Sequence, residues 1–285
     1  MIPPSLDKQI RRAAHAPVTQ VQPVAGGDIN RAARVTLSTG QTLFVKWHPN
    51  PPPGMFPAEA RGLQLLASAH ALRVPAVHFF DETCLGMEWL GRGSRDAAGT
   101  AAALGRGLAQ QHRLTAERYG LEGDNYCGLT PQVNTPAGNW PAFFARNRLG
   151  CQMELAARRN RLPAPRRQRL ERLIARLPTL LPARPPASLL HGDLWGGNWL
   201  VTAAGEPALI DPAVYFGHRE ADLAFTELFG GFPPAFYHAY RQAWPLESGY
   251  PERRDIYNLY HLLNHLNLFG EHYGRSVDAV LKRYT

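Results

Sequence analysis

Three polar residues are spaced in a way that suits phosphoryl transfer. Residues 191–198 read HGDLWGGN, and Asp193 precedes Asn198 by five residues. At this spacing, catalytic loops place an aspartate that accepts the proton of the attacking hydroxyl and an asparagine whose oxygen holds magnesium. Asp211 follows the apolar run 207–210, and carboxylate and amide oxygens are ligands that Mg²⁺ prefers. The pattern predicts Asp193 as the base and Asn198 and Asp211 as metal ligands.

The residues around this motif favour a β-hairpin that carries the polar groups at its ends. Residues 198–201 are predicted to form a strand, residues 203–206 a turn and residues 207–210 the returning strand. A turn-rich loop without chemistry is the alternative, because Asp, Gly and Asn are common in turns. The hairpin brings the polar ends together, so the catalytic interpretation is preferred.

Lysine is rare in this chain, which makes the position of Lys46 informative. Among the 31 Lys and Arg residues, only Lys8, Lys46 and Lys282 are lysines. Lys46 falls in the predicted strand 41–47, where a compact ammonium suits a point contact with phosphate oxygens. Glu59 lies near the start of a predicted helix and is expected to hold Lys46. The alternatives are an exposed strand lysine and a glutamate that only complements the helix dipole.

A pair of glycines precedes Lys46 and lies between two predicted strands. Gly26 and Gly27 separate the segments 18–24 and 33–37. Such a pair is usually a hairpin turn, but in a kinase the same loop covers the phosphates with its backbone N–H groups. The loop does not read GxGxxG, and the chain has no Walker A motif. The glycine loop supports a kinase fold only through the order of the motifs along the chain, which is glycine loop, lysine, glutamate, catalytic loop and magnesium carboxylate.

An apolar segment between these elements is the predicted adenine-binding hinge. Residues 84–91 read CLGMEWLG and are expected to form a strand that ends at a glycine. In kinases the corresponding strand leads out of the small lobe, and its backbone groups pair with adenine. Glu88, Trp89 and Leu90 are therefore the expected nucleotide contacts.

With these residues in place, the chain resembles the fructosamine (ketosamine) kinases, a branch of the aminoglycoside-phosphotransferase-like kinases. The resemblance covers nearly the whole chain. It rests on strings that are more specific than HGD, namely residues 124–128 (DNYCG), 132–135 (QVNT), 191–198 (HGDLWGGN), 210–213 (IDPA), 216–224 (FGHREADLA), 229–232 (FGGF) and 259–265 (LYHLLNH). One departure is Asp28 beside the two glycines, where some relatives have cysteine, and it argues against redox control through this loop.

The resemblance implies an enzyme that uses ATP and Mg²⁺ to phosphorylate a ketosamine. The γ-phosphoryl group would pass to a sugar hydroxyl of a fructosamine or ribulosamine, either on a small molecule or on a glycated protein. Phosphorylation makes such adducts unstable, so the family is regarded as repairing proteins or metabolites. The acceptor pocket is expected near Asp193, with Trp195, Tyr215 and His265 as contributors.

The expected architecture is an α+β, two-lobed, protein-kinase-like fold. Residues 1–90 are predicted to form a nucleotide-binding lobe with a small antiparallel sheet, and residues 91–285 a larger helical lobe that carries the catalytic and acceptor sites. At 285 residues with 45% hydrophobic content, the chain suits one enzyme of this size. We expect a monomer.

Other acceptors and other protein classes remain as alternatives. Aminoglycoside, choline and homoserine kinases share the same core motif. A protein kinase is disfavoured, because Asp211 is separated from Ala221 by only nine residues, which leaves no room for a long activation loop. His261 and His265 have a zinc-ligand spacing, but Leu262 replaces the glutamate of HExxH, so a helix of the core or the substrate cleft is preferred.

Composition limits the possible partners and compartments. A net charge of +8 and eight arginines between Arg158 and Arg176 raise the possibility of nucleic-acid binding. The leucines among them indicate an amphipathic helix with a solvated arginine face, and we expect no nucleic acid as partner. The chain has no run of 18 apolar residues, so no membrane span is predicted. The N-terminus lacks a signal-peptide pattern. Three cysteines without metal-site spacing fit a reduced, cytoplasmic setting.

Overall fold

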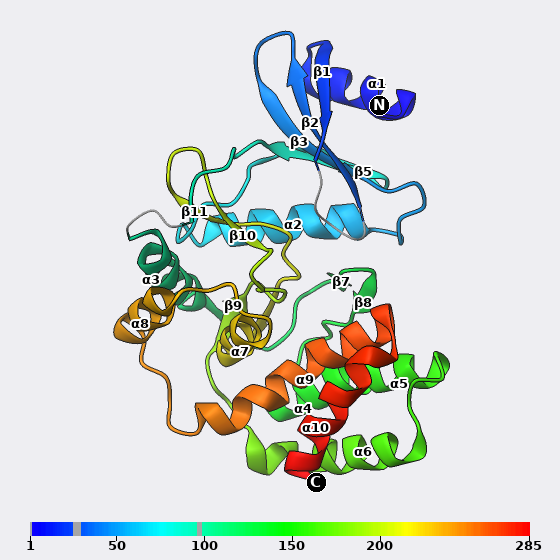
Figure 1. Cartoon of the computed structure of the whole chain (residues 1–285), viewed down its shortest axis with the longest axis vertical. Coiled ribbons are helices and arrows are strands. Elements are labelled where there is room, and N and C mark those ends of the chain that lie inside the picture. The colour runs from blue at the N-terminus through cyan, green and yellow to red at the C-terminus, as the bar shows by residue number, and fades with distance from the viewer. Residues whose placement is uncertain (1, 25–29, 96–98) are drawn as a thin grey trace.

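The chain folds into two lobes, one built around a sheet and the other mainly from helices (Figure 1). A computed structural model describes residues 2–24, 30–95 and 99–285. The sheet is near the N-terminus and the helices gather around the C-terminus. This arrangement is the α+β, protein-kinase-like architecture that the sequence predicts.

The N-terminal sheet has five antiparallel strands, and its register decides which way Lys46 points. The strand order is β1 (Val18–Pro23), β2 (Arg31–Leu37), β3 (Thr42–Trp47), β5 (Cys84–Glu88) and β4 (Val77–Phe80). Side chains alternate between the two faces of a strand. Leu43 and Val45 therefore pack with α1 (Pro4–Ala14) on one face, whereas Phe44 packs on the opposite face with α2 (Met55–Ser68). Lys46 shares the α2 face.

Helix α2 lies between the sheet and the helical lobe and contacts both. Its buried side chains Met55, Phe56, Leu63 and Leu66 pack with strand β5 and with Val214 of the helical lobe. Figure 1 shows α2 running across the base of the sheet. The helix predicted around Glu59 is confirmed, and it begins at Met55.

The predicted catalytic hairpin is also present, and it changes the end of strand β5. Strands β10 (Trp199–Val201) and β11 (Pro207–Leu209) pair antiparallel, as the sequence indicates. The expected strand through Gly91 instead ends at Glu88. The reason is that the Leu90 carbonyl accepts a hydrogen bond from Ala203 N in the hairpin, at 3.0 Å, and therefore leaves the sheet.

The helical lobe contains short strands among longer helices. Its elements are α3 (Thr100–His112), β6 (Thr115–Ala116), β7 (Asn125–Cys127), β8 (Thr130–Gln132), α4 (Trp140–Phe144), η1 (Ala145–Gly150), α5 (Cys151–Arg158), α6 (Ala164–Leu180), β9 (Ala187–Leu190), β12 (Tyr215–Gly217), α7 (Glu220–Leu228), α8 (Pro234–Ala243), α9 (Tyr250–Phe269), η2 (Glu271–Tyr273) and α10 (Gly274–Tyr284). The π-helical turn η1 lies between α4 and α5. Strands β12, β9 and β6 form a small sheet.

The catalytic hairpin rests on a hydrophobic cluster built with α3 and α8. Leu194, Trp199 and Leu209 are buried there with side chains of both helices. The two helices approach closely at Gly105, where an added Cβ would lie 2.2 Å from the Phe236 carbonyl oxygen. A glycine is required at this position because the neighbouring backbone leaves no space for a methyl group.

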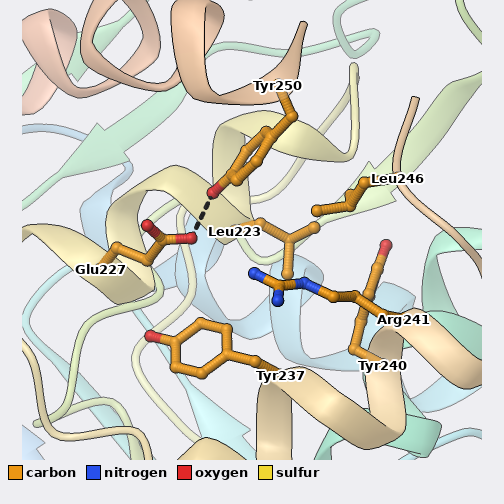
Figure 2. A pocket seen from close by; sticks show the side chains of 7 residues that line it. All are labelled: Leu223, Glu227, Tyr237, Tyr240, Arg241, Leu246 and Tyr250. Atoms are coloured by element: carbon orange, nitrogen blue, oxygen red, sulfur yellow. Dashed lines mark hydrogen bonds between the residues drawn. The ribbon is translucent and has the colours of Figure 1, made fainter. Parts of the chain in front are cut away.

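A small hollow beside α8 has no room for a ligand. Figure 2 shows side chains from α7, α8, the first residue of α9 and the segment before it meeting there. The Tyr250 hydroxyl donates to Glu227 at 2.7 Å. The seven lining side chains leave no space for even a water-sized group. This hollow is part of the packing between the helices.

Among residues 2–24, 30–95 and 99–285, no helix combines the length and the apolar character needed to cross a bilayer. The longest helix, α9, spans 20 residues but carries charged residues and belongs to the core.

The close approach of α3 and α8 gives a test of the packing beneath the hairpin. Gly105→Ala should lower the free energy of unfolding by about 1–3 kcal/mol, a typical cost of overpacking, although alanine is the better helix former. Chemical denaturation would measure the change. Gly123→Ala is the control, because a Cβ there meets nothing within 4 Å, and its effect should stay within about 0.5 kcal/mol. Equal stability of the two variants would contradict this packing.

Candidate active site

A cavity of about 1310 Å³ lies where the two lobes meet, and the predicted catalytic residues line it. Its wall includes Lys46 and Glu59 from the sheet lobe and Asp193, Asn198 and Asp211 from the catalytic hairpin region. These five residues come from segments far apart in the sequence. The fold therefore brings the predicted phosphoryl-transfer groups into one cleft.

Lys46 is the charged contact between the two sides of this cleft. Its ammonium donates to Glu59 Oε1 at 2.8 Å and also contacts Asp211 Oδ1. The side chain is buried, and burial by itself lowers a lysine pKa. The two carboxylates outweigh that effect and raise the pKa of Lys46 above its ordinary value, so the ammonium stays charged.

Asp193 and Asn198 are hydrogen bonded to each other within the catalytic loop. The Asn198 amide nitrogen donates to Asp193 Oδ2 at 3.1 Å and to the Asp193 carbonyl at 2.8 Å. It also approaches the Asp211 carbonyl at 3.4 Å. The amide oxygen of Asn198 is then the atom left to face a cation. Asp211 has a φ of +55°, an unusual backbone conformation that aims its side chain at Lys46.

The environment of Asp193 suits a general base. Burial raises its pKa to about 7, and the charge of Asp211 acts in the same direction, whereas hydrogen bonds from Cys127 and Asn198 oppose the rise. A base is most effective when its pKa lies near the working pH. This environment is therefore compatible with the base role that the sequence predicts for Asp193.

His191 supports the loop and is not placed for proton transfer. The side chain is fully buried, and burial lowers its pKa, so the ring stays neutral. The Asp193 backbone N–H donates to His191 Nδ1 at 3.3 Å, and His191 Nε2 lies 2.9 Å from the Ile210 carbonyl. The ring thus links the catalytic loop to the strand that precedes Asp211.

Asp222 holds the backbone of the same catalytic loop through hydrogen bonds. Its carboxylate accepts hydrogen bonds from the backbone N–H groups of His191 at 2.7 Å and Gly192 at 2.9 Å. Gly192 adopts a φ of +81°, and an added Cβ would lie 2.0 Å from the Ala213 carbonyl oxygen. Hydrogen bonds from two adjacent N–H groups to one buried carboxylate fix the turn immediately before Asp193.

A buried polar network fixes the segment that follows Asp211. Asn125 Nδ2 donates to the Val214 carbonyl at 2.7 Å, and Gln132 Nε2 donates to the Ala213 carbonyl at 3.0 Å. Asn134 and Gln132 both donate to Asn125 Oδ1. The guanidinium of Arg148 completes the network through Asn134 Oδ1 at 2.9 Å. Buried hydrogen-bond networks of this kind rigidify the backbone that they hold.

The predicted hinge residues line the cleft, and some of their backbone groups are already paired. Glu88 N–H donates to the Ala76 carbonyl at 2.8 Å, and the Glu88 carboxylate contacts Arg73. Trp89 stacks on Phe44 with ring centroids 6.1 Å apart. Because the Leu90 carbonyl is bonded to Ala203, a nucleotide base would have to use other backbone groups of the hinge.

The remaining predicted site residues differ in whether they line the cleft. Trp195 is exposed and lines the cleft, and His265 lines it as well. Tyr215 is buried at 3% exposure, with the Arg148 guanidinium 3.9 Å from the ring centroid, and it does not reach the cavity wall. Gly26 and Gly27 of the glycine loop, with Asp28, lie outside the described residues.

Sequence reasoning missed the roles of Asp222, Cys127 and Arg95. Asp222 and Cys127 occur in strings that resemble the family, but no spacing rule links them to the catalytic loop. Cys127 Sγ lies 3.6 Å from Asp193 Oδ1. Arg95 donates to the Gly196 carbonyl at 2.8 Å and stacks over Trp199. Only the folded arrangement brings these residues to the loop.

Comparison with known proteins identifies the class as a kinase phosphotransferase. A family model described as fructosamine kinase matches residues 4–285. A ketoamine kinase from Enterococcus faecium is 42% identical over 270 residues, which cover 93% of this chain and 95% of that protein. Protein-ribulosamine 3-kinase of Arabidopsis thaliana, named as chloroplastic, is 38% identical over 94% of this chain and 83% of its own length.

A solved structure supports the same conclusion. The protein from Thermobifida fusca described as a fructosamine-3-kinase has a TM-score of 0.89 and 33% identity, with 98% of this chain and 97% of that chain covered. Solved phosphotransferases with 12% to 18% identity share the fold and show nothing beyond it. The chain belongs to the fructosamine kinase family, as its sequence motifs indicate.

The raised pKa of Asp193 predicts how activity depends on pH. With Asp193 as the base, only its ionised carboxylate can accept the proton, so kcat/KM should fall toward low pH, by about tenfold per unit below a midpoint near pH 7. A pH–rate profile with the preferred acceptor would measure this limb. A profile that stays flat from about pH 5 to about pH 8 would contradict the assignment of Asp193 as the titrating base.

Proposed function

We propose that this protein is an ATP- and Mg²⁺-dependent kinase that phosphorylates a sugar hydroxyl of a ketosamine. The acceptor is a fructosamine or ribulosamine, either on a small molecule or on a glycated protein. The observation that carries the proposal is the convergence of Lys46, Asp193, Asn198 and Asp211 on one cleft in a member of the fructosamine kinase family. A relative named protein-ribulosamine 3-kinase supports the acceptor class.

Asp193 orients the acceptor hydroxyl and receives its proton as the new P–O bond forms. Phosphoryl transfer depends mainly on positioning and on charge stabilisation. Hydrogen bonds to Asn198 and the fixed turn at Gly192 hold the carboxylate in place before the acceptor arrives. The transferred proton stays on the Asp193 carboxylate, whose raised pKa makes the protonated form accessible.

The oxygen donors next to Asp193 fit Mg²⁺. Asn198 offers an amide oxygen and Asp211 a carboxylate, and Mg²⁺ is usually bound by one or two carboxylates together with phosphate oxygens and water. Bound there, the ion would neutralise charge on the β- and γ-phosphates. Asp211 contacts the Lys46 ammonium, so the carboxylate is already oriented toward the part of the cleft where phosphates are expected.

Lys46 steadies the α- and β-phosphates, and Glu59 fixes the direction of its ammonium. The hinge residues Glu88, Trp89 and Leu90 contact the base, and the loop of Gly26 and Gly27 covers the phosphates. These roles follow from the positions of the described residues along the cleft wall and, for the two glycines, from sequence order alone.

The acceptor side of the cleft is aromatic. His265 packs against Phe229, Phe269 and Tyr273 with ring centroids 5.0, 5.4 and 5.1 Å away. Trp195 is 43% exposed. Apolar rings with a few polar groups suit the carbon skeleton of a sugar adduct, so Trp195 and His265 are proposed contacts and Tyr215 is a supporting residue behind them.

We propose residues 1–90 as the nucleotide-binding lobe and residues 91–285 as the catalytic and acceptor lobe of a cytoplasmic monomer that takes part in protein deglycation. The three cysteines, Cys84, Cys127 and Cys151, are free thiols, which agrees with a reducing compartment. Neither a nucleic acid nor a membrane is proposed as a partner.

An acceptor panel tests the proposal. ADP release should be measured with fructosyl-lysine, ribulosyl-lysine, an aminoglycoside, choline and homoserine, and turnover is expected only with the ketosamines. Asp193→Asn should lower kcat by about two to four orders of magnitude and still show a rise in melting temperature with Mg-ATP, because binding to the native state stabilises it.

Two outcomes would contradict different parts of the proposal. Turnover of choline or an aminoglycoside with neither ketosamine used would reject the acceptor class and keep the kinase site. Unchanged kcat in Asp193→Asn would reject the assigned base.

A further inference from the structure

A sulfur and a nitrogen donor converge on the carboxylate of Asp193, the proposed catalytic base. Cys127 at the end of β7, His261 on α9 and Asp193 each offer one ligand atom, and these atoms lie within 4.8 Å of one another. The distance from Cys127 Sγ to Asp193 Oδ1 is 3.6 Å. Thiolate, imidazole and carboxylate together are a donor set for Zn²⁺. The pair of Asn198 and Asp211 instead offers only oxygen atoms.

His261 is a buried histidine with an unpaired ring nitrogen among the described residues. Its side chain is 5% exposed, and among the described residues its Nδ1 has no hydrogen-bond partner. A buried polar group left unpaired costs about 1–3 kcal/mol. Burial holds the pKa of His261 well below its ordinary value, so the ring is in the neutral form that coordinates metals. Phe225 stacks on the ring at 3.5 Å between centroids and fixes its plane.

The group of donor atoms that converges in the structure differs from the histidine pair suggested by spacing. His265 lies one helical turn after His261 and donates through Nδ1 to the His261 carbonyl at 2.8 Å. Its ring faces the aromatic side of the cleft, beside Phe229. His261 is therefore grouped with Cys127 and Asp193, which come from other segments.

We propose that Cys127, His261 and Asp193 form an inhibitory site for Zn²⁺. The ion occupies the carboxylate that must receive the acceptor proton, and this consequence rests on the proposed role of Asp193. Cys127 and Asp193 both line the main cavity, so the ion enters from the cleft. Mg²⁺ prefers oxygen ligands and is not expected to compete at a thiolate–imidazole pair.

The geometry needs only small side-chain movements. With Zn–S near 2.3 Å and Zn–N near 2.0–2.1 Å, a tetrahedral site places its donor atoms roughly 3.4–3.8 Å apart. The donor atoms now lie up to 4.8 Å apart. Side-chain rotations that shorten these distances by about 1 Å would bring the atoms into the tetrahedral range. Three protein ligands then leave the fourth position to water from the cleft.

Binding must release the proton of Cys127. Burial and the neighbouring Asp193 charge raise the pKa of the thiol well above its ordinary value, so the sulfur carries a proton before the ion binds. The S–H bond breaks, the proton passes to solvent, and the sulfur lone pair forms the bond to zinc. Asn264 Nδ2 lies 3.4 Å from the sulfur and remains as a hydrogen-bond donor to the thiolate.

Cobalt(II) titration of the full chain without nucleotide tests the site directly. The wild-type protein should bind one ion with a thiolate-to-cobalt charge-transfer band, and Zn²⁺ should displace it. Cys127→Ser should abolish the band, and both Cys127→Ser and His261→Gln should weaken zinc binding by at least about 10–100-fold, the cost of losing even an outer-shell partner. Retained melting transitions would show that the variants are folded.

Matched controls separate this site from adventitious binding. Cys151→Ser and His238→Gln change a partly exposed thiol and an exposed imidazole elsewhere in the helical lobe, and both should bind zinc as the wild type does. With Mg-ATP in excess, zinc should inhibit the wild type and both controls, and the two site variants should need at least about tenfold more zinc for the same fractional inhibition.

Several results would overturn the proposal. They are a cobalt complex without a thiolate band, wild-type zinc affinity in either site variant, or inhibition that persists unchanged in both, which would place the inhibiting ion at Asn198 and Asp211. If only the role of Asp193 fails, the cobalt spectrum remains and the inhibition disappears. The two ideas are therefore distinguishable.

Discussion

The buried ammonium of Lys46 is the contact on which the rest of the cleft depends. It holds Glu59 of helix α2 at 2.8 Å and also contacts Asp211, which lies 165 residues away in the sequence. An isolated buried ammonium would cost several kcal/mol, and the two carboxylates compensate for that cost. The same ion pairs keep the carboxylates from repelling each other. One lysine thus connects helix α2 of the sheet lobe to Asp211, the proposed magnesium ligand in the helical lobe.

The catalytic loop and the segment after Asp211 are held by buried hydrogen-bonding groups. Asp222 pairs with two backbone N–H groups, and the network around Asn125 holds the segment after Asp211. Because these bonds are buried and satisfied, breaking one would leave an unpaired polar group and cost about 1–3 kcal/mol. The geometry around Asp193 is therefore fixed before a substrate binds. Phosphoryl transfer depends on such positioning of the reacting groups.

Much of this site could be predicted from spacing alone, and the reasons are local. Asp193 and Asn198 share one loop, Asp211 follows the returning strand of the same hairpin, and strand alternation decides the direction of Lys46. Tyr215 shows where such reasoning stops. It lies close to Asp211 in the sequence, yet the cation–π contact with Arg148 holds it in the core.

The contacts that could not be predicted join segments far apart in the chain. Asp222 reaches the loop because α7 packs beneath it, and Cys127 reaches Asp193 across 66 residues. No periodic pattern or turn signal encodes these distances. The end of β5 is another example, because the Leu90 carbonyl leaves the sheet for a partner in the hairpin.

The most direct measurement is a crystal structure with Mg²⁺, a non-hydrolysable ATP analogue and a ribulosyl-lysine acceptor. We expect a sugar hydroxyl oxygen within about 2.6–3.2 Å of the Asp193 carboxylate. We also expect Asn198 and Asp211 on the metal and the Lys46 ammonium at the α- and β-phosphates. An acceptor bound in the cleft with its hydroxyl groups turned away from Asp193, or a metal held by other residues, would contradict the proposed mechanism.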